Sequence, residues 1–163
     1  MNESSKEATM KQQTPHGSEL ARLSDTDLVL SEEQLDIRNR KVVDRHGAEI
    51  GHVDNLFIDQ KERKVRMLQI RAGGILGLGE RHFLLPVDAI TSVADDEVHV
   101  NVTLERIVGS PVYDPSIVPA PTQQSWGSYY GYYGYTPYWS AGYTYPRFTA
   151  RPDESAREGR YVR

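Results

Sequence analysis

The stretch KVVDRHGAEIGHVDNLFID, residues 41–59, determines the fold. It predicts two strands joined by a tight turn at His46–Gly47, where glycine supplies the positive φ that a short hairpin needs. In the second strand the apolar phase slips between Val53 and Leu56, which predicts a β-bulge near Asp54–Asn55. Bulges and bends of this kind let a small sheet close into a barrel.

Short strands continue through residues 65–104. Their segments are VRMLQIR, RHFLLPV and EVHVNVTL, separated by glycine-rich or acidic turns. In the last segment Val98, Val100 and Val102 alternate with polar residues, which is the period of a half-buried strand. Gly51, at the start of the second strand, allows a close approach or a sharp coil. Five or six short strands without a long helical period predict an all-β fold, a small closed β-barrel.

Composition divides the chain into three parts. Residues 1–18 are polar, with almost no large apolar side chain, and are predicted to form a disordered N-terminal tail. Residues 19–114 are predicted to hold the barrel with its flanks, including a short helical turn at LSDTD with Ser24 as N-cap. Residues 115–163 form a Pro/Gly/Tyr-rich low-complexity tail, which is predicted to be disordered when alone.

Charge and cysteine content argue against several classes of function. The 163 residues carry a net charge of −4 without a broad basic face, so nucleic acid is not the expected partner. Cysteine is absent, which removes disulfides and thiolate metal sites. The sequence shows no secretory signal and no apolar run of roughly 18 residues. We therefore expect a cytoplasmic protein without a transmembrane segment.

The glycine-rich segment at residues 73–79 does not match a phosphate-binding loop. Its order is Gly74-x-x-Gly77-x-Gly79. A dinucleotide loop needs G-x-G-x-x-G before a helix, and a Walker loop needs Gly-Lys followed by Ser or Thr. The residues that follow, HFLLPV, predict a strand instead. We expect a flexible turn between two barrel strands and no cofactor.

The polar side chains of the predicted barrel do not form a catalytic or metal-binding pattern. The histidines lack close ligand spacing: His46 lies in the predicted turn, and His52, His82 and His99 fall on different strands. Three aspartates are expected to cap turns and charge strand edges, rather than to act as acid–base pairs: Asp54, Asp59 and Asp88. No serine lies in a nucleophile-elbow context. The basic cluster KERKVR, residues 61–66, is expected to be a solvated turn. An enzyme is therefore not expected.

Roughly residues 20–114 resemble the PRC-barrel domain. The resemblance is carried by KVVDRHGAEIGHVDNLFID, KVRMLQI, GGILGLG, and LLPVDAI followed by an acidic turn and EVHVNV. That domain occurs in the H subunit of purple bacterial photosynthetic reaction centres and at the C-terminus of the ribosome-maturation factor RimM. The resemblance implies a stand-alone bacterial barrel that serves as an assembly or docking module and not as a catalyst. It transfers no functional residue to a position of this chain.

Aromatic residues concentrate after the predicted barrel. Eight of the ten tyrosines and both tryptophans lie between residues 125 and 148, and no residue from 115 to 146 is charged. Tyrosine and tryptophan are effective interface anchors. The candidate interaction residues are Tyr129, Tyr130, Tyr132, Tyr133, Tyr135, Tyr138, Trp139 and Tyr143. Three interpretations stay open: the segment docks on a partner or on itself, it is an inert extension, or part of it wraps onto the barrel with Tyr113 as its first contact.

These observations predict a non-enzymatic PRC-barrel adaptor for protein–protein assembly, with the aromatic tail as a second contact that raises avidity. Its partner is a protein of unknown identity or a second copy in a homo-oligomer. One alternative is an RNA- or ribosome-associated maturation factor resembling RimM, which the KERKVR cluster would suit. The other is an H-subunit-like accessory to a membrane electron-transfer complex.

Overall fold

The computed structural model describes residues 20–30, 36–73, 79–116 and 121–147, and the backbone of residues 149–150. The predicted N-terminal tail and most of the glycine-rich segment lie outside the described residues. In chain order the elements are β1 (Leu20–Arg22), the 3-10 helix η1 (Leu23–Asp25), β2 (Lys41–Val43), β3 (Glu49–Asp59), β4 (Lys64–Ala72), β5 (Arg81–Pro86), the 3-10 helix η3 (Val87–Ala89), β6 (Ile90–Val93), β7 (Glu97–Val100), α2 (Leu104–Val108), α3 (Gln123–Tyr133) and β8 (Thr149–Ala150).

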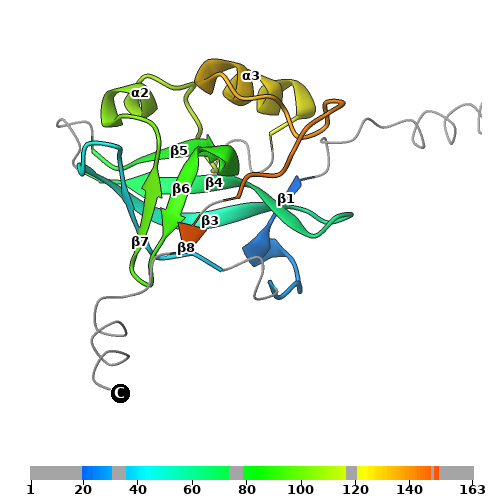
Figure 1. Cartoon of the computed structure of the whole chain (residues 1–163), viewed down its shortest axis with the longest axis horizontal. Coiled ribbons are helices and arrows are strands. Elements are labelled where there is room, and N and C mark those ends of the chain that lie inside the picture. Colours follow the sequence, from blue (N-terminus) through cyan, green and yellow to red (C-terminus); the bar gives the residue numbers. More distant parts are fainter. Residues whose placement is uncertain (1–19, 31–35, 74–78, 117–120, 148, 151–163) are drawn as a thin grey trace, which may run out of the picture.

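One curled sheet forms the body of the protein (Figure 1). Its strands follow the order β5-β4-β3-β2-β7-β6-β8, and β1 pairs with the second half of β3. The pairs are antiparallel except for β2–β7 and β6–β8, which are parallel. Strand β3 organises the sheet, because β2 and β1 pair with its first and second halves while β4 pairs along its other edge.

The sheet is a half-barrel, so the prediction of a closed barrel is wrong. Closure would require β5 and β6, at the two ends of the six-strand path, to pair, and the described part of the chain contains no such pairing. The reason lies in their connection. Pro86 ends β5 without a backbone N–H, and η3 then carries the chain across to β6 instead of back along β5. The outer edge of β5 is therefore an end of the sheet.

Most of the local predictions for the strands are confirmed. The register of β3 against β4 shifts between Val53 and Asn55, which places the bulge at Asp54. Gly47 has a φ of 86° in the turn between β2 and β3. A Cβ at Gly51 would lie 2.3 Å from the carbonyl oxygen of Arg71, so the strand–strand approach there requires glycine. The sequence pattern therefore predicted the course of β3 correctly.

The predicted N-cap at Ser24 is wrong. Helix η1 follows Arg22, and Ser24 lies inside it. The Ser24 hydroxyl instead accepts a hydrogen bond from Nδ2 of Asn55 at 2.7 Å. Asn55 is adjacent to the bulge, which redirects its side chain. This hydrogen bond therefore links β1 and η1 to β3.

Asp44 links the β2–β3 turn to the start of α2 through hydrogen bonds. Its side chain is buried, and Oδ1 accepts hydrogen bonds from the backbone N–H groups of His46 and Ala48, both at 2.8 Å. Oδ2 accepts from the N–H of Leu104 at 2.9 Å. Burial alone would raise the pKa of Asp44, but these three donors outweigh it and the pKa lies below its ordinary value.

We expect Asp44→Asn to lower the free energy of unfolding by about 1.5–3 kcal/mol at neutral pH, because charge-assisted hydrogen bonds are lost. A depressed pKa in the folded state gives stability that is present above the unfolded pKa of 3.8 and is lost as the pH falls below it. Urea unfolding between about pH 3 and pH 7 should therefore show the wild-type advantage shrinking at the acid end. An advantage that stays constant with pH would contradict this role.

Both faces of the central strands are buried. Inside the half-barrel, Leu56, Leu68 and Leu85 belong to a cluster that extends to β6 and β7. On the opposite side, Phe57, Met67 and Leu84 form what we call the outer face. Successive side chains of a strand point to opposite sides, so two covers are required. The second cover comes from α3 and the residues around it.

Helix α3 and the residues around it cover the outer face. We call residues 121–147 the aromatic segment; Figure 1 shows α3 beside α2 on one side of the sheet, with the following residues running past the sheet toward β8. The Thr122 side chain caps α3 by accepting from the N–H of Ser125, and Gly134 ends it at a φ of 82°. The expected disorder is therefore wrong for these residues. Their rings do not have to form a core by themselves, because they pack against the apolar side chains of the outer face.

Candidate functional site

The contact between the aromatic segment and the outer face is centred on Trp126. Its side chain is 0 % exposed, and its ring lies 4.9 Å from that of Phe57, centroid to centroid, at an interplanar angle of 67°. Tyr113 approaches Phe57 edge-on at 6.3 Å, and Tyr129 lies 6.3 Å from Trp126. Edge-to-face pairs of this kind add to the free energy gained by burying the rings.

The structure brings the eight predicted interaction residues together over one side of the sheet. Tyr129 and Tyr130 are buried. The other six are half-buried: Tyr132, Tyr133, Tyr135, Tyr138, Trp139 and Tyr143. Of the three interpretations that the sequence left open, the structure matches the one in which the segment wraps onto the barrel and Tyr113 joins the contact. A role for these residues in binding a partner stays a prediction.

Arg66 of β4 lies under the aromatic segment. Its side chain is 3 % exposed, and its guanidinium carbon lies 4.3 Å from the centre of the Tyr138 ring, 5.8 Å from that of Tyr143 and 5.5 Å from that of Tyr145. It also pairs with Asp59 at 3.4 Å and with Glu62. The prediction of a solvated basic turn is therefore wrong for Arg66. A buried guanidinium held by rings and carboxylates fixes the segment on the sheet.

Hydrogen bonds of the tyrosine hydroxyls join the rim of this contact. Tyr143 donates to Oδ2 of Asp88 at 2.9 Å, and Tyr145 donates to the backbone carbonyl of Val65 at 2.9 Å. Tyr132 donates to the carbonyl of Arg106 at 2.6 Å, and the Arg106 guanidinium donates back to the carbonyl of Tyr132. Apolar ring area in the centre and hydroxyl bonds at the edge are typical of a protein–protein interface.

Burial under the segment shifts several pKa values. It raises the pKa of Tyr129 to about 12, and it raises those of Tyr130, Tyr133 and Tyr143 further above the ordinary value. Burial also raises the pKa of Asp88, and the hydrogen bond from Tyr143 opposes that rise. These groups therefore report whether the segment lies on the sheet.

We expect Tyr143→Phe to lower the free energy of unfolding by about 1–2 kcal/mol near neutral pH, because it removes a donor from the Asp88 carboxylate. Since the folded pKa of Asp88 is already raised, its contribution to stability is full below 3.8 and is lost as the pH rises through the folded value. Without the hydrogen bond from Tyr143 the folded pKa of Asp88 should rise further, so the variant should lose more stability than the wild type as the pH rises. Urea unfolding at several pH values measures it.

Tyr135→Phe is the matched control for that substitution. Tyr135 belongs to the same segment and is half-buried, but no hydrogen bond of its hydroxyl occurs among the described residues. We expect a change below about 0.5 kcal/mol. Equal losses in the two variants would show that the Tyr143–Asp88 bond contributes nothing specific.

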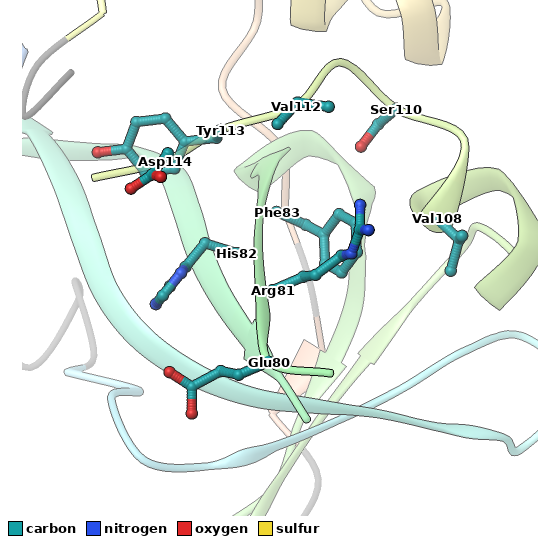
Figure 2. Close-up of a pocket in the computed structure, with 9 residues that line it drawn as sticks. All are labelled: Glu80, Arg81, His82, Phe83, Val108, Ser110, Val112, Tyr113 and Asp114. Atoms are coloured by element: carbon teal, nitrogen blue, oxygen red, sulfur yellow. The ribbon is translucent and has the colours of Figure 1, made fainter. Parts of the chain in front are cut away.

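A groove opens at the end of the sheet beside Tyr113 (Figure 2). It has a volume of about 440 Å³ and runs between β5 and the stretch that follows α2. Its lining residues are Glu80, Arg81, His82, Phe83, Val108, Ser110, Val112, Tyr113 and Asp114. The backbones of Tyr113 and His82 form an isolated antiparallel bridge, so the chain around Tyr113 already lies beside β5 as a further strand would.

The groove combines apolar and charged side chains. Figure 2 shows Glu80 and His82 on one side of β5 and Arg81 and Phe83 on the other. Val112 is 84 % exposed, which is unusual for a large apolar side chain in this protein. An open groove with a strand end, an exposed valine and both signs of charge suits a segment of another protein better than a small molecule, which requires a more enclosed site.

The His, Asp and Glu side chains of the described residues are the other candidates for a chemical site. No three His, Asp or Glu side chains come together there as a metal site would require. The three aspartates hold separate roles: Asp54 accepts from Gln69, Asp59 caps the turn at Lys61 and pairs with Arg66, and Asp88 accepts from Tyr143. Within the described ranges, no helix is both long and apolar enough to cross a membrane.

Sequence reasoning missed the outer face and Arg66. The available signal was the run of adjacent apolar residues in LFI, VRML and FLL, which indicates strands buried on both faces. In those runs Phe57, Met67 and Leu84 stand next to inward-facing leucines. Such a pattern indicates a sheet that must be covered on both faces.

Comparison with known proteins adds one finding. Residues 32–107 match the family model of the PRC-barrel domain. No curated protein matches the chain in sequence. The matched region runs from before β2 to α2, so it holds the half-barrel and stops before the aromatic segment.

Proposed function

Since this chain is a PRC-barrel domain protein, we propose that it is a non-enzymatic adaptor in the cytoplasm that holds a protein partner at the open end of its half-barrel. PRC-barrel domains are generally non-catalytic and serve as interaction or assembly modules. The observation that carries the proposal is the groove along β5, with Val112 exposed beside a strand end. An extended segment of a partner fits such a place by lying along the backbone and burying the valine.

The aromatic segment has an accessory role in this proposal. Most of its ring area covers the outer face, which leaves the half-buried rings of Tyr135, Tyr138 and Trp139 for a second contact. A second contact on the same partner raises affinity through the effective concentration that the first contact provides. The groove supplies the primary contact and these rings extend it.

The RNA-associated alternative loses part of its support. Arg66, one of the four cations in KERKVR, is buried and paired with carboxylates, so it does not face solvent. Lys61 and Arg63 are exposed, which leaves a small basic turn. No observation among the described residues favours the H-subunit-like alternative. Both remain outcomes of the experiment that tests the adaptor.

Affinity capture from host lysate with Val112→Asp tests the proposal. Because the partner would bury Val112, a charge at this position should weaken partner binding at least tenfold, equivalent to about 1.4 kcal/mol. The matched control is Val29→Asp, because Val29 is 93 % exposed and lies outside the groove. Capture that survives in the control and falls in the groove variant supports the proposal.

Two results would contradict the proposal. Equal capture by both variants would remove the groove as the docking site. Loss of all partners after RNase treatment would favour the ribosome-associated alternative. Full-length protein is required throughout, because ending the chain at Asp114 would strip the cover from Phe57, Met67 and Leu84 and create a false binding surface.

A further inference from the structure

We propose that Tyr143 and Asp88 form a redox-active pair, in which Tyr143 is oxidised reversibly by one electron while its hydroxyl proton passes to Asp88. The oxidant is a radical of the peroxyl class, so the pair acts as a radical scavenger. This activity is separate from the adaptor function, because neither residue lines the groove beside β5. It rests on the hydrogen bond of 2.9 Å from the Tyr143 hydroxyl to Oδ2 of Asp88.

The acceptor of the Tyr143 hydroxyl distinguishes it from other tyrosines of the aromatic segment. Loss of an electron turns a phenol into a strong acid, so a tyrosine is oxidised readily at neutral pH where a base can take its proton. Tyr143 donates to a carboxylate. Tyr129 and Tyr132 donate to backbone carbonyls, which accept hydrogen bonds but do not take up a proton at neutral pH.

Asp88 is placed to accept the proton. Its Oδ1 is buried and has no hydrogen-bond partner among the described residues, so few donors compete with Tyr143 for the carboxylate. Burial raises the pKa of Asp88 above its ordinary value, which makes the carboxylate a stronger proton acceptor. Asp44 gives the contrast, because three backbone N–H donors there outweigh burial and hold the pKa below its ordinary value.

Neighbouring rings give the oxidant access to Tyr143. Tyr138 and Tyr143 lie against the same guanidinium, that of Arg66, at 4.3 Å and 5.8 Å from its central carbon. The ring of Trp139 lies 5.2 Å from that of Tyr138, centroid to centroid, and both are half-buried. An electron taken from one of these accessible rings is replaced from Tyr143, where transfer of the proton to Asp88 holds the oxidation.

The sequence offers oxidants few other targets. Thiols and thioethers are the side chains that oxidation usually reaches. The 163 residues include no cysteine, and Met67, the methionine among the described residues, is 0 % exposed. Eight tyrosines and both tryptophans lie in the aromatic segment instead. The rings of this segment are therefore the groups that a radical meets.

In the forward step the peroxyl radical gains one electron and becomes a peroxide anion, which takes a proton from water. The O–H bond of Tyr143 breaks, an O–H bond forms at Oδ2 of Asp88, and a neutral tyrosyl radical remains. A one-electron reductant of the ascorbate class then returns the electron, and Asp88 returns the proton. Both side chains regain their starting state.

Flash photolysis of the full chain with tris(bipyridine)ruthenium and a cobalt(III) ammine quencher tests the pair, because the ruthenium(III) that forms is a one-electron oxidant. The readouts are the absorption and the electron paramagnetic resonance spectrum of the tyrosyl radical, in ordinary and in heavy water. Asp88→Asn keeps an acceptor for the Tyr143 hydroxyl but removes the base, so it should slow radical formation on the order of a hundredfold. Tyr143→Phe should remove this radical. Tyr132→Phe is the matched control, because Tyr132 donates to the carbonyl of Arg106.

The expected result is a radical that forms more slowly in heavy water, is lost in Tyr143→Phe and persists in Tyr132→Phe. Equal rates in ordinary and heavy water would overturn the inference, and that measurement on the wild-type protein depends on no variant. Equal rates in the wild type and Asp88→Asn would also overturn it. Val112→Asp should leave the radical unchanged, so failure of the redox pair and failure of the adaptor function are told apart.

Discussion

Trp126→Ala is expected to lower the free energy of unfolding by about 3–5 kcal/mol, the usual cost of removing a fully buried aromatic side chain. The ring is 0 % exposed and lies against Phe57 at the centre of the contact between the aromatic segment and the sheet. Its removal leaves a cavity between α3 and β3. Urea unfolding followed by far-ultraviolet circular dichroism measures the loss, since that signal does not depend on the deleted tryptophan.

Gln124→Ala provides the control for this substitution. Gln124 lies on the same helix and is exposed, so the change should stay within about 0.5 kcal/mol. A loss below about 1 kcal/mol for Trp126→Ala would mean that the segment contributes little to the fold, as an inert low-complexity extension would.

Gly51→Ala is expected to cost about 3 kcal/mol or more, at the upper end of the range for overpacking a well-packed site. The added Cβ would lie 2.3 Å from the carbonyl oxygen of Arg71 and 3.0 Å from the Cα of Ala72. Both neighbours are backbone, so the clash can be relieved only by moving β3 away from β4. Thermal unfolding should show a large drop in Tm.

The matched control is Gly131→Ala in α3, the same chemical change in open space. Outside the backbone of its own helix, no heavy atom lies within 4 Å of a Cβ added there, and the position is helical. Alanine in place of glycine inside a helix should stabilise the protein by about 0.5–1 kcal/mol. Destabilisation by both substitutions, or by neither, would contradict the packing described for β3 and α3.

The strands could be predicted from the sequence because a strand's period is set by its backbone. The slip between Val53 and Leu56 located the bulge at Asp54, and the need for glycine at Gly51 followed from a strand that must bend. Closure of the barrel could not be predicted in this way. It depends on where η3 directs the chain after Pro86, which is a property of the tertiary structure.

Helix α3 was hidden by its composition. Gly127 and Gly131 lower helix propensity, and alternating glycine and tyrosine is typical of disordered low-complexity segments. A helical signal was nevertheless present: Trp126, Tyr129 and Tyr130 have the i, i+3, i+4 spacing of one buried helix face. Thr122 and Gly134 stand at the two ends as caps. The segment needed a surface to pack on, and only the structure shows that the sheet provides it.

The position of Arg66 followed from the same packing. In the sequence it belongs to a charged run, and charged runs are usually solvated. The structure buries it because the aromatic segment covers that part of β4 and supplies ring faces in place of water. Without knowledge of the cover, the sequence could not distinguish Arg66 from its exposed neighbours Lys61 and Arg63.

The measurement that tests the packing of the aromatic segment most directly is a spectrophotometric titration of the ten tyrosines. Tyrosines whose folded pKa is raised give stability that is present below the ordinary value of 10.0 and is lost as the pH rises above it. We predict a group of tyrosines that ionises well above the ordinary value, with Tyr129 near pH 12 and with Tyr130, Tyr133 and Tyr143 ionising only when the segment leaves the sheet. A single transition of all ten tyrosines near pH 10 would contradict the account, because it would show that solvent reaches every ring.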